Sequence, residues 1–142
     1  SNCGIDYEQM FRNMEVRDNV NVHFMSGYQQ ANLSATVYHS ACVVICCLET
    51  KYTVGLTTVV EALAFGLPII CSRNPQIPVD FDKEKCGISV PYDDKDGWIR
   101  YVQEHPDEAR KMGQRARQLA EQMYNDRRCA AEVAQVLKKY ER

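Results

Sequence analysis

Short aliphatic runs that alternate with helix-like segments constrain the fold of this chain most strongly. The runs "CVVICC" (42–47), "PIICS" (68–72) and "CGISVPY" (86–92) are typical of buried strands, and "NVNVHFM" (19–25) alternates apolar and polar residues as a half-buried strand does. Between two of these runs, "GLTTVVEALAFG" (55–66) has apolar residues at helical spacing and ends at a glycine. Strands separated by helices predict an α/β fold, a parallel sheet flanked by helices.

The remaining segments are mostly helical in pattern. Apolar residues at helical spacing predict a helix near 29–40 and another that contains Trp98, after "DDKDG". "PDEARKMGQRARQLAEQMY" and "DRRCAAEVAQVLKKY" predict two amphipathic helices that complete the chain. "NPQIPVDF" contains two prolines and predicts a loop or a single helical turn.

Length and composition exclude several classes of protein. The 142 residues suffice for one domain, so we interpret 1–142 as a single domain or a fragment of one. The net charge of −2, with both signs interspersed, argues against nucleic-acid binding. Seven cysteines, some within an apolar run, favour buried thiols in a reducing, cytoplasmic compartment over a disulfide framework. Scattered histidines predict no metal site, and no apolar run is long enough to predict a transmembrane segment.

The candidate site follows from the expected sheet, because ligands of open parallel sheets bind beyond the carboxyl ends of the strands. Gly55 allows close approach of the backbone, and the amides of Leu56, Thr57 and Thr58 at a helix start can face a phosphate or diphosphate. Glu61 lies one turn further on roughly the same side, where its carboxylate can accept hydrogen bonds from the vicinal hydroxyls of a sugar.

Ser26 and Gly27 directly follow the first expected strand, and we expect them at the base side of a bound nucleotide. A purely structural alternative is equally open on local spacing. Thr58 and Glu61 fit the T-x-x-E capping box, in which the glutamate only accepts from a backbone amide. A P-loop is excluded because the GK[ST] sequence is missing, and no G-x-G-x-x-G follows the first strand.

The order "NVHFMSGY … ATVYHSACVVICC … GLTTVVEALAFGLPIICS … CGISVPYDD … PDEARKMGQRARQLAEQMYN" resembles the carboxyl-terminal half of GT-B glycosyltransferases of the large retaining family called group 1 or family 4. The resemblance runs from about Asn19 to the end of the chain. Its most specific piece, "VVEALAFGLPIICS", is similar to the "EAmAxGxPVI" core of that family.

This resemblance implies a Rossmann-like domain that binds a nucleotide-sugar donor, such as a UDP- or GDP-sugar, without a separate cofactor. Glu61 matches the second glutamate of the E-x7-E motif, which contacts the ribose, and Leu56 to Thr58 would lie at the diphosphate. Thr53 stands where the first glutamate of that motif is expected. Glu49 is the nearest acidic residue and the only candidate for its catalytic role.

The resemblance also implies that the chain is an incomplete GT-B carboxyl-terminal domain, inactive by itself, whose acceptor would bind through an absent amino-terminal domain. Missing strands would leave unpaired edges at which the fragment could self-associate. The expected activity is transfer of a sugar to a glycan or lipid, by a cytoplasmic or peripheral membrane enzyme. Two alternatives stay open: a non-catalytic α/β nucleotide-binding or regulatory module, and a sugar-nucleotide epimerase of the same fold.

Overall fold

A computed structural model of the protein describes residues 9, 12–13, 21–23, 27, 29–47, 51–94 and 96–140. The chain divides into two compact units, Ser1–Ser34 and Ala35–Arg142, and the second carries the sheet. The helix α2 (Gln30–Tyr38) spans the boundary between these units and matches the helix expected near 29–40.

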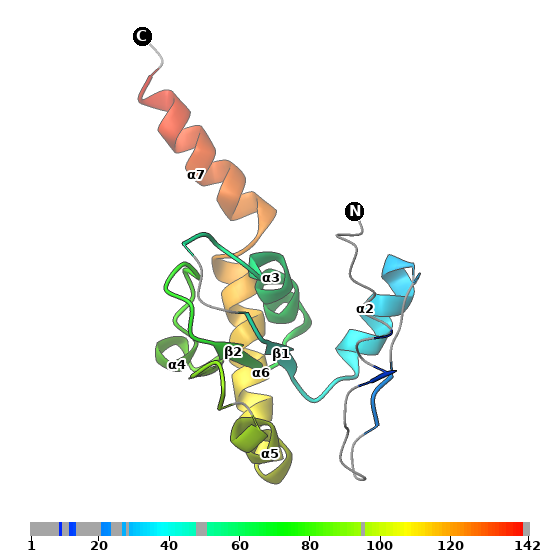
Figure 1. The fold of residues 1–142 in the computed structure, drawn as a ribbon. Coiled ribbons are helices and arrows are strands. Elements are labelled where there is room, and N and C mark those ends of the chain that lie inside the picture. The colour runs from blue at the N-terminus through cyan, green and yellow to red at the C-terminus, as the bar shows by residue number, and fades with distance from the viewer. Residues whose placement is uncertain are drawn as a thin grey trace. The chain divides into compact units, whose positions relative to one another are not determined.

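A parallel three-stranded sheet forms the centre of the second unit (Figure 1). Its strands are β1 (Val43–Ile45), β2 (Ile69–Ser72) and β3 (Gly87–Val90), in the order β1-β2-β3. The helix α3 (Leu56–Phe65) connects β1 to β2, and the short helix α4 (Phe81–Glu84) precedes β3. The chain therefore has a Rossmann-like α/β arrangement, as the alternation of strands and helices predicts.

Three helices follow the sheet: α5 (Asp96–Glu104), α6 (Pro106–Gln122) and α7 (Asp126–Lys138). Proline is the first residue of α6, where the missing amide hydrogen costs no helical hydrogen bond. The side chain of Asn125 accepts a hydrogen bond from the Arg128 N–H and so caps the start of α7. None of the described helices is long and apolar enough to cross a membrane.

The core has two parts, one on each face of the sheet. The first combines α3, the loop before α4 and the second half of α6, with Val59, Leu63 and Leu119 fully buried. The second combines α5 with the first half of α6, around Ile70 and Val90. Because α6 contributes to both parts, it ties the two faces of the sheet together.

A close contact between two glycines fixes α6 against the segment that enters β2. A Cβ atom built on Gly113 would lie 2.2 Å from the carbonyl oxygen of Gly66, far below any normal contact. One turn further, the Arg117 guanidinium donates a hydrogen bond to the Ala64 carbonyl at the end of α3. The "MGQRAR" sequence thus has a packing role at the amino ends of the strands.

Two expectations about strands need correction. The run 19–25 is not a strand at 21–23, where Val22 is 52% exposed, and its other residues lie outside the described part of the chain. Alternation alone does not make a strand, because its backbone groups need a neighbouring strand as partner. In "CVVICC" only Val43–Ile45 is strand, β1 lies at an edge of the sheet that the described residues form, and Val44 and Cys46 are exposed and belong to neither part of the core.

Candidate functional site

The start of α3 is an open end of a helix at the carboxyl side of the sheet. Gly55 precedes the helix in the left-handed conformation, with φ 78° and ψ 5°, and no side chain of a described residue caps the helix. The Val59 N–H bonds the Gly55 carbonyl at 3.0 Å, so this amide is not available to a ligand. The amides of Leu56, Thr57 and Thr58 have no acceptor among the described residues, which leaves three donors for an anion.

This geometry rules out the capping-box alternative for Glu61. The helix begins at Leu56, so Thr58 is its third residue rather than its cap, and Glu61 is the sixth. A carboxylate that far inside cannot reach the amide at the helix start. Glu61 is exposed and makes no hydrogen bond or ion pair with the described residues. Thr57 and Thr58 are exposed as well, one turn before it.

Ser72 joins the carboxyl ends of the two strands beside this helix. Its buried hydroxyl accepts a hydrogen bond from the Cys47 N–H at 2.8 Å and donates one to the Cys47 carbonyl at 2.6 Å. The side chain therefore extends the pairing of β1 and β2 past their ends. It thereby holds Cys47, just past the end of β1, against the end of β2.

A second tether connects the segment before α3 to the loop after β2. The Thr53 hydroxyl donates to the Gln76 carbonyl at 3.2 Å, and the Gln76 N–H donates to the Asn74 side-chain oxygen at 2.9 Å. Asn74 is 9% exposed, and its Nδ2 has no hydrogen-bond partner among the described residues. A buried donor without an acceptor costs about 1–3 kcal/mol. This unpaired Asn74 donor lies in the turn to which the Thr53 hydroxyl is hydrogen-bonded.

Three thiols in or beside the strands, Cys42, Cys71 and Cys86, are poor nucleophiles. Burial, together with the neighbouring Cys47 and Cys46, raises the pKa of the Cys71 thiol to about 11. Burial also raises the pKa of Cys42 and that of Cys86, the latter to about 11. These groups stay protonated at neutral pH and pack as small apolar side chains.

The remaining site predictions fall on parts of the chain about which the structure says less. Glu49 and Ser26 lie outside the described residues. Gly27 is described, exposed and left-handed at φ 69°, but it belongs to the first unit. Of the predicted residues, Gly55, Leu56, Thr57, Thr58 and Glu61 are those that the structure brings together on one helix.

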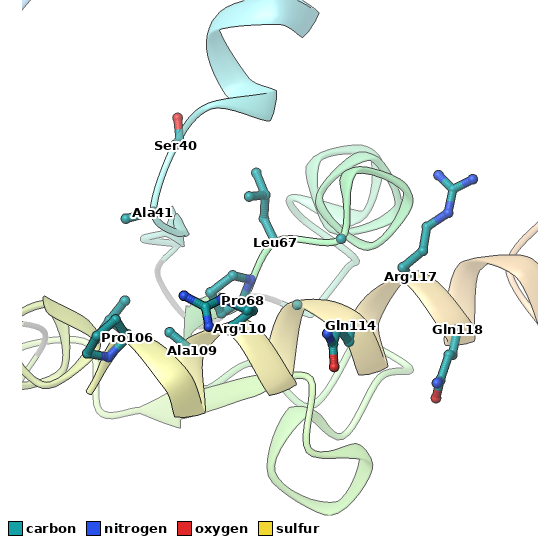
Figure 2. Close-up of a pocket in the computed structure, with 13 residues that line it drawn as sticks. Ser40, Ala41, Leu67, Pro68, Pro106, Ala109, Arg110, Gln114, Arg117 and Gln118 are labelled. Atoms are coloured by element: carbon teal, nitrogen blue, oxygen red, sulfur yellow. The ribbon is translucent and has the colours of Figure 1, made fainter. Parts of the chain in front are cut away.

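Of the cavities that the described residues form elsewhere, two matter here, and sequence reasoning missed both. One has a volume of about 620 Å³ and lies between α6 and the segments that enter β1 and β2, with Ala41, Pro68 and Ala109 in its wall (Figure 2). The other, of about 590 Å³, lies between β3, α5 and α6. Such hollows form where elements distant in sequence meet, and no local pattern marks them.

Comparisons with known proteins add one match. No curated protein and no solved structure matches the chain. A family model described as glycosyl transferase-like matches residues 9–136, which is most of the chain and includes the whole sheet, α3 and α6. With its Rossmann-like sheet and the open start of α3, the chain thus belongs to the glycosyl transferase-like family.

Proposed function

We propose that this chain is the donor-binding part of a GT-B glycosyltransferase and that the start of α3 holds a nucleotide-sugar. The amides of Leu56, Thr57 and Thr58 bind the diphosphate, assisted by the positive end of the helix dipole. Glu61 accepts hydrogen bonds from the ribose hydroxyls. One observation carries the proposal: three amides and a carboxylate without partners among the described residues lie within two turns of one helix, at the carboxyl edge of a parallel sheet.

Other features of this edge support the proposal. Gly55 has a left-handed backbone and no side chain, so a phosphate can approach the first turn of α3 closely. The orphan Nδ2 of Asn74 offers a further donor to a ligand oxygen or to a water beside it. The donor would be a UDP-, GDP- or ADP-linked sugar, and the acceptor a glycan or lipid.

Thr53 bears on the chemical step. Its hydroxyl is engaged with the Gln76 carbonyl, and it brings no carboxylate to the site. We therefore expect the isolated 142-residue polypeptide to bind donor without transferring sugar. Release of free or transferred sugar from any nucleotide-sugar by this polypeptide, measured by chromatography, would contradict the expectation.

Nucleotide titration followed by NMR tests the binding proposal. UDP, GDP and ADP, each with and without an attached sugar, are added to the wild-type protein while the amide signals of Leu56 to Thr58 are observed. At least one compound should shift these signals in a saturable way. Absence of any shift at this helix start, with every nucleotide, would sink the proposal.

The role of Glu61 is tested with Glu61→Gln. Loss of the charge should weaken binding about tenfold or more, because hydrogen bonds to charged groups are strong. Glu104→Gln, an exposed change of the same type on α5, is the matched control and should have no effect. With a 2′,3′-dideoxy nucleoside diphosphate, Glu61→Gln should lose most of its effect. An equal effect on both nucleotides would show that Glu61 does not hold ribose.

A further inference from the structure

The 590 Å³ cavity between β3, α5 and α6 has an apolar interior. Ile88 and Met112, which belong to the second part of the core, line it together with the rings of Trp98 and Tyr101. These two rings meet edge to face, with centroids 5.7 Å apart. The volume falls in the range of small-molecule sites, which are also mostly apolar with a few polar groups at defined places.

The charged groups around the cavity are unequally engaged. The Asp82 carboxylate accepts from the Ser89 N–H at 3.2 Å, and Glu108 accepts from the Tyr101 hydroxyl. The Arg115 guanidinium pairs with Glu84 at 2.8 Å. Lys85 and Lys111 also line the cavity, and neither has an ion-pair partner among the described residues. Among the described residues, Lys85 and Lys111 are therefore the cavity cations without an ion-pair partner, beside two carboxylates that each accept one hydrogen bond.

The backbone of Lys85 has a left-handed conformation, which residues with a Cβ atom rarely adopt. This lysine is the single non-glycine residue with positive φ in the described part of the chain, at φ 56°. Glycine adopts this conformation more readily than any residue that has a Cβ atom. Here the conformation closes α4, because the Lys85 N–H donates to the Asp82 and Phe81 carbonyls and so fixes the backbone of this lysine at the cavity.

We propose that this cavity is a second binding site, for a small molecule with a flat aromatic body and one anionic group. The aromatic body packs against Trp98, Tyr101 and Met112, since aromatic rings favour aromatic partners. A carboxylate or phosphate on the ligand pairs with Lys85 and Lys111. The site lies where β3 begins, whereas the start of α3 lies at the carboxyl edge of the sheet. It is therefore independent of the proposed donor site.

The single tryptophan of the chain makes the test direct, because Trp98 gives the one indole N–H signal in an NMR spectrum. The probes are 2-naphthoate and 2-naphthyl phosphate, with 2-naphthamide as the neutral counterpart of the naphthoate and inorganic phosphate as the anion alone. At least one naphthyl anion should shift the Trp98 signal in a saturable way. The amide should bind several-fold more weakly, and phosphate alone should leave the signal unchanged.

Two double variants test whether the charges of Lys85 and Lys111 hold the anion. Lys85→Gln with Lys111→Gln removes both cations from the exposed rim and should weaken binding of the anion about tenfold. Lys138→Gln with Lys139→Gln removes the same charge from α7 and its end and should change it less than about twofold. No saturable shift with either anion, equal affinity for anion and amide, or equal effects of the two double variants would each overturn the proposal.

Discussion

The two ends of α3 have opposite environments, although a left-handed glycine stands at each. At the carboxyl end Gly66, with φ 70°, donates its N–H back to Ala62 and Leu63, and Gly113 of α6 packs directly against it. At the amino end the glycine has φ 78°, and the amides beyond it have no acceptor among the described residues. One end of the helix is closed by packing, and the other is open, with no partner for its amides in the described part of the chain.

The segment "GLTTVVEALAFGLPIICS" has two parts with different roles. In its first part, Thr57, Thr58 and Glu61 are exposed, and the first-turn amides have no acceptor among the described residues, so only water or a ligand can pair with them. Its last part, from Gly66 to Ser72, is buried or half-buried and engaged in packing and strand pairing. Substitutions at the closed end should therefore damage stability, and those at the open end mainly binding.

The largest effect is expected from Gly113→Ala. The new Cβ would lie 2.2 Å from the Gly66 carbonyl, within rigid backbone, so α6 would have to move away from the segment entering β2. The free energy of unfolding in urea should fall by about 3 kcal/mol or more.

Gly97→Ala on α5 is the matched control, because its Cβ would meet nothing within 4 Å. Alanine favours the helix there and should raise stability by about 0.5–1 kcal/mol. If the two variants changed stability to a similar extent, the contact between Gly113 and Gly66 would not be what closes the carboxyl end of α3.

A smaller effect is expected from Gly55→Ala at the open end. The left-handed backbone disfavours alanine, and the added Cβ would lie 3.0 Å from the Ile45 side chain, so a loss of about 1–2 kcal/mol is expected in the same urea experiment. Gly55→Asn adds a Cβ too, but asparagine tolerates this φ better. A milder loss for asparagine would assign the cost to the backbone, and an equal loss would assign it to the contact with Ile45.

The smallest effect is expected from Thr58→Ala. Because Thr58 is exposed in the first turn and does not cap α3, stability should change by less than about 0.5 kcal/mol. Asp80→Ala is the comparison, since Asp80 does cap α4 by accepting from the Lys83 N–H at 3.0 Å, and its loss should cost about 1 kcal/mol. If the threonine change costs as much as the aspartate change, the helix start has been assigned to the wrong residue.

Much of the second unit was predictable from local pattern. Periodicity and glycine placement locate α3 and its end at Gly66, because that position needs positive φ, which glycine adopts freely. The aliphatic runs likewise locate β2 and β3, where every described side chain is buried or half-buried. Residue spacing left two roles open for Glu61, a ligand-binding group or a capping residue, because spacing does not show which residue of "GLTT" begins the helix.

The sequence by itself determined the alternation of strands and helices, and with it the α/β sheet and the edge at which a ligand would bind, because these depend on short-range periodicity. Only the tertiary structure decided that α3 begins at Leu56, that Thr53 is tied to Gln76, and that Gly113 meets Gly66. It also brought Lys85, Trp98 and Lys111 around one cavity. Each of these depends on contacts between segments far apart in the chain, which no local pattern encodes.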